Sequence, residues 1–448
     1  NRSINSDDAQ HGCFIKLSRH FADHGYYQMS ELNFALRKNA ALSMLSFIAN
    51  VVVVFVGYRL IIKFHGLEAL GLWSLLMSWS YLARLGDLGL SSSAARLTAR
   101  LGREKSHNLL KNTVAVGLSL HIFASGAVSG LIGLVLLALV PKELVQLVPG
   151  AVALVFLAML NLHVGGILQG FHKGFLSAYS NLLGLCINVI CLLFLAETLG
   201  IVALLIGGIA QTTVSLIVNI RWVSNTLGLP GLWPKRHKFW IARCILSYSL
   251  KIHVLNFTNG FFEPLSKLLI ARVAGAEALG LYEMALKLVV LPRNALMSAI
   301  HAGLPALTIS VSENSAELPF KYRHASRISL RSFLGLSSFT VGLSPLVSLF
   351  WMDSFDQTFV GLVAILSIGY FGNSVGAPAY MLGLAKGRLA VNFMGASVTL
   401  LILAGCFFLP ITLLSIWTST ALIATMLTVS ALFVRWQNEA KLLSSVPT

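Results

Sequence analysis

The sequence predicts an all-α integral membrane protein with about 12 transmembrane helices, arranged as two parallel six-helix lobes around a central cavity. Three observations predict this fold class: the composition, the number of long apolar stretches and an internal repeat. Of the 448 residues, 56% are hydrophobic and 11% are charged, and the mean hydropathy is +0.78. Because a soluble globular chain carries about 25% charged residues, most of this chain must face lipid or other buried helices.

Apolar stretches long enough to cross a bilayer recur along the chain, since a membrane-spanning helix needs about 20 apolar residues. They are residues 42–62, 70–92, 113–139, 149–168, 177–196, 200–220, 245–271, 279–305, 328–350, 358–378, 391–409 and 411–434. Only Pro410 separates the last two stretches, so this boundary is the weakest of the set.

The basic residues between these stretches gather on one side of the expected membrane. That side receives Arg37, Lys38, Arg96, Arg100, Arg103, Lys105, Lys111, Lys173, Arg221, Lys235, Arg236, Lys238, Arg243, Lys321, Arg323, Arg327, Lys386, Arg388, Arg435 and Lys441. Because cytoplasmic loops carry the excess of Lys and Arg, we expect both termini in the cytosol. The net charge of +16 therefore reflects membrane orientation, and we expect no nucleic acid partner.

An internal repeat indicates that the two halves of the chain share one arrangement of helices. Residues 66–73 read GLEALGLW and residues 275–282, 209 positions later, read GAEALGLY. Upstream, the Leu-Ile pair at 60–61 recurs at 269–270. The period is too long for a solenoid, which repeats every 20 to 50 residues. Six helices per half make the halves parallel repeats, as in doubled transporter bundles.

These observations divide the chain into five parts. We expect a cytosolic, disordered tail (1–36), an N-lobe (37–221), a cytosolic basic linker (222–244), a C-lobe (245–434) and a cytosolic C-terminal tail (435–448).

Polar residues inside the apolar stretches indicate the site, because a charge within a bilayer is costly and usually faces a cavity or a partner. The candidate substrate-binding residues of the cavity are Arg84, Lys267, Lys287, Arg293, Asn256, Asn259 and Asn294. The candidate ion-coupling residues are Asp87, Glu263, Glu283 and His301.

A structural role for some of these charges remains an alternative. The pairs Glu263–Lys267 and Glu283–Lys287 have i,i+4 spacing and could neutralise each other, and Arg84–Asp87 could do so at i,i+3. Four candidate cations face three candidate carboxylates, which predicts a weakly cationic cavity suited to an anionic cargo.

Two further charged or titratable side chains are expected to lie outside the cavity. Arg59 points away from the polar face of its helix, so we expect it to extend towards the membrane interface. His163, in the last turns of its helix, is expected to be an interfacial residue, with a ligand role as the alternative.

Motifs for enzymes, cofactors and metals are missing from the sequence. There is no GxxxxGK[ST], HExxH or GxSxG, and neither the five cysteines nor the histidines show metal-ligand spacing. We therefore expect no cofactor, no metal and no enzymatic activity. An intramembrane transferase remains a rival class, for which the Asp353–Asp356 turn is the only acidic candidate.

Two hairpins resemble a known family. The run LGDLGLSSSAARLTAR (85–100) resembles a segment of bacterial polysaccharide flippases. The stretches FFEPLSKLLIARVAGAEALGLYEMALKL (261–288) and LPRNALMSAIHAGLPAL (291–307) look like their helix 7–8 hairpin. These are the O-antigen and exopolysaccharide flippases (Wzx type) of the multidrug/oligosaccharidyl-lipid/polysaccharide exporter (MOP) superfamily. The resemblance covers about residues 33 to 440.

This resemblance implies a V-shaped, two-lobed transporter of the bacterial inner membrane that works by alternating access. It would flip a polyprenyl-pyrophosphate-linked oligosaccharide from the cytosolic to the outer leaflet for O-antigen, exopolysaccharide or capsule synthesis. Its partners would be this lipid-linked oligosaccharide, membrane lipids and the polysaccharide polymerase machinery. By analogy Arg84, Lys267, Lys287 and Arg293 would meet the pyrophosphate or acidic sugars. The alternative is a cation-coupled multidrug exporter of the same superfamily.

Overall fold

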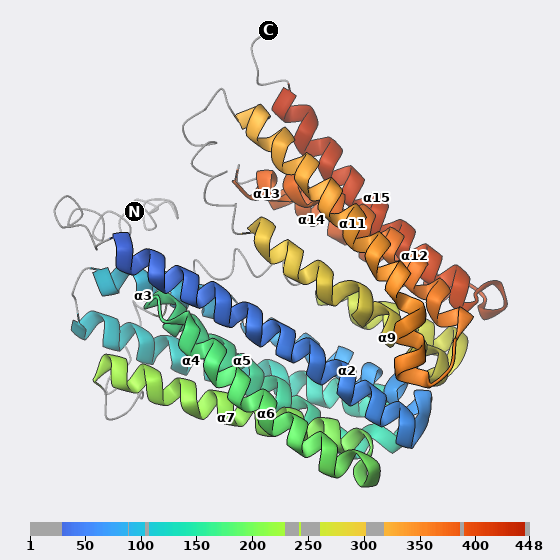
Figure 1. Cartoon of the computed structure of the whole chain (residues 1–448), viewed down its shortest axis with the longest axis horizontal. Helices are drawn as coiled ribbons and strands as arrows, with labels where there is room; N and C mark the ends of the chain where they lie inside the picture. Colours follow the sequence, from blue (N-terminus) through green and yellow to red (C-terminus); the bar gives the residue numbers. More distant parts are fainter. Residues whose placement is uncertain are drawn as a thin grey trace, which may run out of the picture.

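The computed structural model describes residues 29–87, 89–103, 107–228, 242, 260–301, 318–385 and 389–443. These residues form helices joined by short turns, and no strand occurs among them. Two helical bundles lie side by side and diverge towards the end of the molecule that carries both chain termini (Figure 1). The predicted all-α fold with two lobes is confirmed.

The N-lobe is built from the first half of the chain. Its elements are α2 (Met29–Tyr81), the 3₁₀ helix η1 (Leu82–Asp87), α3 (Leu90–Arg103), α4 (His107–Leu139), η2 (Lys142–Leu147), α5 (Val148–Gly170), α6 (Gly174–Leu199) and α7 (Ile201–Leu227).

The C-lobe is built from the second half. Its described elements are α9 (Phe262–His301), α11 (Leu318–Met352), α12 (Gln357–Val375), α13 (Ala377–Ala385), α14 (Leu389–Gly405), η3 (Cys406–Phe408), η4 (Ile411–Leu413) and α15 (Ile416–Leu443).

The predicted repeat appears in the structure as two matching kinks. Gly66 breaks α2 with φ 81° and ψ 177°, and Gly275 breaks α9 with φ 84° and ψ 180°. This backbone region is essentially restricted to glycine, so the first residue of each repeat is the one that turns the chain. Each kink separates two helical arms, which correspond to the first two predicted helices of each half.

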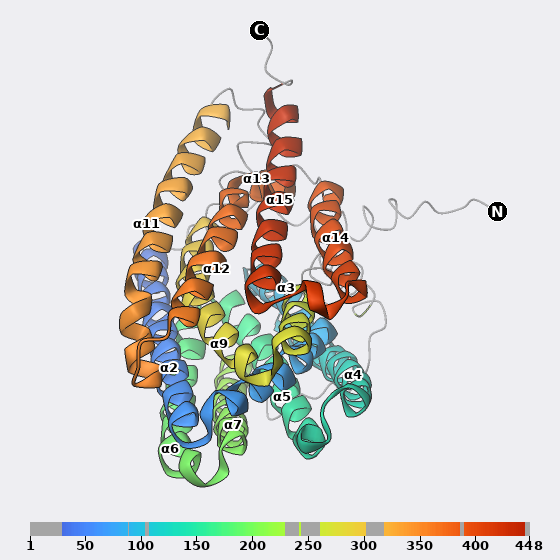
Figure 2. The same ribbon diagram turned by 90° about the vertical axis from the view of Figure 1, so that its right-hand side faces the viewer.

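The two lobes join at the end of the molecule opposite the termini, which we call the closed end. There α2 packs against α9 of the other lobe as well as against α6 of its own. One hydrophobic core runs across the junction and contains Ile61 and Leu70 of α2, Leu279 of α9 and Trp351 of α11. Viewed from the closed end, the kinked α2 and α9 lie between the remaining helices of the two lobes (Figure 2).

Nine helices within the described ranges are long and apolar enough to cross a membrane. The segment 41–80 is one of the nine but contains two predicted stretches, because α2 continues through its kink. Neither arm of α9 is among them, since this helix carries several charged residues. The composition of these helices therefore agrees with a multi-pass membrane protein. Residues 245–259, which belong to the seventh predicted stretch, lie outside the described residues.

Several predicted boundaries shift. The helix α2 begins at Met29, within the predicted tail, and α15 continues to Leu443. Both extensions consist mainly of good helix formers, which continue a helix beyond the apolar run. The last helix begins at Ile416 rather than 411, because Ser415 and Thr418 cap each other's backbone N–H groups, at 3.2 and 2.7 Å. Residues 1–28 and 229–241 of the predicted tail and linker lie outside the described part.

Candidate functional site

The two repeats cross each other in close contact at the junction of the lobes. A Cβ atom on Gly71 would clash with the carbonyl oxygen of Ala276, and one on Gly280 would clash with that of Leu67. Gly71 and Gly280 occupy equivalent positions of the two repeats, as do Leu67 and Ala276. The crossing is therefore approximately twofold symmetric, and small residues allow the two backbones to approach.

Glu283 lies beside this crossing and is surrounded by hydrogen-bond donors from both lobes. Its side chain accepts hydrogen bonds from Tyr58 Oη and Ser74 Oγ of α2, each at 2.7 Å. Lys267 Nζ lies 2.7 Å from Glu283 Oε2. Glu283 and Lys267 are each only 2% exposed. Two buried opposite charges therefore tie the arms of α9 to each other and to α2.

A second pair of charges surrounds the first. Glu263 lies 2.6 Å from Lys267 Nζ, and Lys287 lies 3.4 Å from Glu283 and 3.9 Å from Glu263. The Glu263 and Lys287 side chains are 44% and 25% exposed. Two lysines and two glutamates balance, so the cluster carries no net charge. Both predicted i,i+4 pairs, Glu263–Lys267 and Glu283–Lys287, are present, and the Lys267–Glu283 contact joins them.

The cluster is asymmetric although the helices that carry it are repeats. Tyr58 occupies the position in the first repeat that Lys267 occupies in the second, and Ser74 likewise corresponds to Glu283. The first half thus supplies neutral hydrogen-bond donors where the second half supplies charges. Glu283 is the point where all four equivalent positions meet.

Arg293 lies apart from the cluster and binds α12 of its own lobe. Its guanidinium donates hydrogen bonds to Asn373 Oδ1 at 2.5 Å and to Ser374 Oγ at 3.1 Å, and it lies 5.3 Å from the centre of the Tyr370 ring. These contacts orient the guanidinium through neutral partners, which leaves its positive charge unneutralised by them. The exposed Asn294 accepts a longer hydrogen bond from Arg293, at 3.4 Å.

Asp87 lies in the N-lobe at the end of η1 and takes no part in the charge cluster's ion pairs. It accepts hydrogen bonds from the Ser91 hydroxyl and, at 3.1 Å, from the Ser91 backbone N–H, which caps the start of α3. The 3₁₀ helix η1, which ends at Asp87, means that ideal α-helical angles do not apply between Trp73 and Ser91. The Arg84 side chain lies outside the described part, so its pairing with Asp87 stays a prediction.

A polar cavity of about 420 Å³ lies within the N-lobe between α2, η1, α5 and α6. Its lining residues are Ser43, Ser46, Asp87, Ala158, Met159, Asn161, Leu162, Gly165, Gln169, Gly174, Ser177, Ala178 and Asn181. Ser46 accepts a hydrogen bond from Asn181 at 2.7 Å, and Asn181 in turn accepts one from Gln211 at 3.3 Å. Ser43 and Ser46 of α2 therefore face a cavity within their own lobe.

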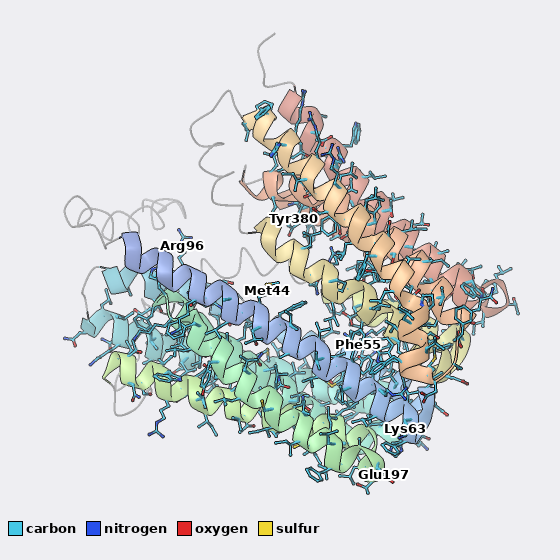
Figure 3. All side chains as sticks on the ribbon, viewed as in Figure 1. Met44, Phe55, Lys63, Arg96, Glu197 and Tyr380 are labelled. Carbon is cyan, nitrogen blue, oxygen red and sulfur yellow. The ribbon has the colours of Figure 1, made fainter. Side chains whose placement is uncertain are left out.

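Contacts between the lobes also close the end opposite the termini. Arg59 lies 2.7 Å from Asp353 and donates a hydrogen bond to the carbonyl oxygen of Phe350. Trp351 Nε1 donates to the carbonyl oxygen of Phe55 at 3.0 Å. Figure 3 places Phe55 between the lobes and Lys63 and Glu197 at the closed end itself. The prediction that Arg59 extends into the membrane interface is wrong, because a carboxylate of the other lobe binds it.

The acidic turn at 353–356 has a structural role at both of its carboxylates. Asp353 binds Arg59, and Asp356 caps α12 by accepting a hydrogen bond from the backbone N–H of Phe359 at 2.8 Å. Spacing alone could not reveal the Arg59–Asp353 pair, because the residues are 294 positions apart and belong to different lobes.

Some predicted site residues cannot be placed. Asn256 and Asn259 lie outside the described residues, and His301 is described only as the last residue of α9, without its side chain. Among the candidates with described side chains, only Lys267, Lys287, Glu263 and Glu283 form one cluster.

Comparisons with known proteins give a family match for part of the chain and a fold for nearly all of it. Residues 175–350 match the model of a family described as "polysaccharide biosynthesis protein". No curated protein sequence matches the chain significantly. The family model thus covers the last helices of the N-lobe and the first helices of the C-lobe.

Solved structures match nearly the whole chain. An inward-facing multidrug resistance MATE family transporter of the MOP superfamily has a TM-score of 0.67 at 15% identity, covering 92% of this chain and 98% of that one. The chain has the fold of a MOP-superfamily transporter. An outward-facing MATE family transporter gives 0.64 at 15% identity, with 92% and 96% covered. A MOP-superfamily transporter from Pyrococcus furiosus, whose reversed pocket polarity suggests a different function, gives 0.61 at 15% identity, with 92% and 97% covered.

The predicted resemblance to polysaccharide flippases of this superfamily is confirmed by the family model and the fold together. The chain is thus similar in fold to proteins seen in both inward-facing and outward-facing conformations. At 15% sequence identity, the solved structures show only the fold. The cargo must be inferred from the residues of this chain.

Proposed function

We propose that the transporter flips a polyprenyl-pyrophosphate-linked oligosaccharide from the cytosolic to the outer leaflet of the bacterial inner membrane. The observation that carries the proposal is the match of residues 175–350 to a polysaccharide biosynthesis family on a transporter fold. Its partners would be the lipid-linked oligosaccharide, the surrounding lipids and the polymerase that uses the flipped product. Both termini would lie in the cytosol, as the distribution of basic residues predicts.

The contacts at the closed end support an alternating-access cycle. The lobes diverge towards the termini and meet at the opposite end through Arg59–Asp353 and Trp351–Phe55 (Figure 1). With the termini in the cytosol, this arrangement is an inward-facing state. An outward-facing state would require these contacts to break and the lobes to meet at the other end.

The charges of the site favour an anionic headgroup over a cationic drug. Glu263 and Glu283 are both bound by lysines, so neither carboxylate offers an unpaired negative charge for a cationic compound. Arg293 is positioned by neutral side chains, which suits it to a phosphate or carboxylate oxygen. Lys267 and Lys287 are balanced by the two glutamates of their cluster. Among the remaining candidates, Asp87 offsets one of the two arginines, so the predicted excess of one positive charge requires Arg84 as well as Arg293.

The two rival functions explain less of the structure. A cation-coupled multidrug exporter agrees with the fold of the solved relatives but requires an acidic or aromatic pocket. An intramembrane transferase requires reactive acidic residues, and the carboxylates of the 353–356 turn are used to join the lobes and to cap α12. We therefore infer a transporter without enzymatic activity.

Lipid analysis of a strain that lacks the gene tests this function. The surface polysaccharide and the polyprenyl-linked lipids would be measured by mass spectrometry, beside sensitivity to cationic drugs. We expect loss of the polymer and accumulation of a polyprenyl-pyrophosphate oligosaccharide. Normal polymer and lipids together with new sensitivity to cationic drugs would instead establish the exporter.

Complementation links the phenotype to the site. The strain would receive wild type, Arg293→Gln or the matched control Arg435→Gln, which removes an arginine from an i,i+4 pair with Glu439 in α15. We expect the control to restore the polymer and Arg293→Gln to fail at normal membrane levels. Full restoration by Arg293→Gln would remove this residue from the cargo site.

A further inference from the structure

Asp87, His121 and His163 come together in the N-lobe from η1, α4 and α5. One ligand atom of each residue lies within 4.8 Å of those of the other two. His121 Nδ1 is 3.3 Å from Asp87 Oδ1, and the two imidazole rings stack with centroids 4.6 Å apart. Sequence spacing gave no sign of this cluster, because each residue lies on a different helix.

Both histidines are buried without hydrogen bonds of normal geometry. His121 is 0% exposed and His163 is 1% exposed, and neither nitrogen of either ring has such a hydrogen bond. The prediction that His163 is an interfacial residue is therefore wrong. The groups that face His121 are Asp87, His163 and the backbone of Met159. Buried polar atoms almost always have a partner, so the His163 imidazole, which has no hydrogen bond, indicates a bound ligand beside the His121–Asp87 pair.

The chemistry of these three side chains selects a transition metal ion. Two imidazole nitrogens and one carboxylate oxygen suit zinc and its neighbours in the first transition row, whereas calcium and magnesium prefer oxygen ligands. Ligands about 2.1 Å from a tetrahedral zinc ion lie about 3.4 Å apart. The 3.3 Å between His121 and Asp87 fits this spacing. The 4.8 Å limit for the set means that the His163 nitrogen would move closer by up to about 1.4 Å. The His163 ring would also turn out of its stack with His121, because an imidazole binds a metal in the plane of its ring.

We propose that Asp87, His121 and His163 bind a divalent transition metal ion, with zinc as the best-matching ion. The site would be three-coordinate in protein ligands, with a fourth position for water. Asp87 and Met159 also line the 420 Å³ polar cavity, which gives the ion a hydrated route of entry. Because Asp87 caps α3, the bound ion would tie the start of α3 to α4 and α5. This goes beyond the proposed flipping of a lipid-linked oligosaccharide and does not depend on it.

Zinc binding by the purified, full-length transporter in detergent tests the site. After removal of bound metal, zinc would be titrated in competition with a chromophoric chelator, and cobalt would be followed by its visible absorption. We expect one buried zinc per chain and the intense cobalt bands of a four-coordinate site with nitrogen and oxygen ligands. Binding should fall at least tenfold in His163→Gln and in Asp87→Asn.

His324→Gln is the matched control, since it removes an exposed histidine on α11 and should leave the stoichiometry unchanged. Loss of the strong binding in this control would assign the metal to the surface. Equal binding by wild type and His163→Gln, or no stoichiometric binding by wild type, would overturn the proposal. In that case the histidines would form a protein-only stacked pair.

A second measurement does not depend on whether the variants fold. An ion that binds only the folded state raises the melting temperature with concentration. Zinc should therefore raise the melting temperature of the wild type at equimolar concentration, and magnesium should not. An unchanged melting temperature with zinc would contradict a site that joins three helices.

Discussion

Glu283 is the residue on which the junction between the lobes depends most. It is buried, it neutralises Lys267, and it accepts hydrogen bonds from Tyr58 and Ser74 of the other lobe. The sequence predicted the i,i+4 pairs, because that spacing places two side chains on one helix face. It could not predict the contact with Ser74, since pairing between equivalent positions of two repeats depends on how the helices cross.

Glu283→Gln should destabilise the transporter strongly. The change leaves the Lys267 charge buried with only the half-exposed Glu263 as its carboxylate partner, and removing one member of a buried ion pair costs about 3–5 kcal/mol. Thermal unfolding in detergent would show a lowered melting temperature. Glu439→Gln serves as the control, with a smaller decrease, because its pair with Arg435 is partly exposed to solvent. Equal decreases in both variants would contradict the central role of Glu283.

Replacing both buried charges should be tolerated better than replacing one. Lys267→Met with Glu283→Leu removes the pair and leaves Glu263 and Lys287 3.9 Å apart to balance each other. Apolar residues of similar volume often substitute for a buried ion pair without loss of stability. We expect the melting temperature of the double variant to exceed that of Glu283→Gln. A lower melting temperature would mean that the hydrogen bonds from Tyr58 and Ser74 to the Glu283 carboxylate contribute more stability than its ion pair with Lys267.

The helices themselves follow from the apolar stretches, and the repeat follows from the sequence echo. What the stretches could not show is the geometry of the breaks. The region after Tyr81 becomes a 3₁₀ helix and then starts a new helix capped by Asp87, so the predicted apolar stretch 70–92 is divided among α2, η1 and α3. Polar side chains that bind backbone groups compete with helical hydrogen bonds, and apolar periodicity does not register this competition.

The two glycine kinks make a prediction about α2. Gly66 has φ 81°, and a Cβ atom at this position would meet no other atom within 4 Å, so Gly66→Ala tests backbone strain without a steric clash. We expect a loss of about 1–3 kcal/mol, because this backbone region is essentially glycine-only. Gly335→Ala, in a regular helix with equally open surroundings, should be neutral or stabilising. Equal effects on the melting temperature would contradict the assignment of Gly66 as the turning residue.

The arrangement of the entire molecule was only partly predictable. The two lobes follow from the repeat and the hairpin motifs, but the contacts that hold the lobes together do not. One such contact is Arg59–Asp353, which joins residues 294 positions apart. Because this pair joins the lobes at the closed end, it would break in the outward-facing state of the proposed alternating-access cycle.

Arg59→Met should shift the transporter towards opening of the closed end. Spin labels on Lys63→Cys and Phe355→Cys, in a variant whose native cysteines are replaced by serine, would report the distance between the lobes. We expect a longer distance to gain population by up to roughly fivefold, since a largely exposed ion pair contributes about 1 kcal/mol at most. Arg272→Met is the matched control, because Arg272 binds the carbonyl oxygen of Phe407 in its own lobe. The same shift in both variants would show that the effect is not specific to the interlobe pair.

Translocation by the purified transporter in liposomes is the decisive measurement for the proposed flipping. A polyprenyl-pyrophosphate oligosaccharide would be placed in both leaflets, and a glycosidase added outside would cut whatever reaches the outer surface. We expect the inner-leaflet share also to be cut when wild-type transporter is present, and to stay protected with Arg293→Gln or without protein. Protection of the inner-leaflet share in the presence of folded wild type, together with uptake of a cationic dye, would refute the flippase and establish the exporter.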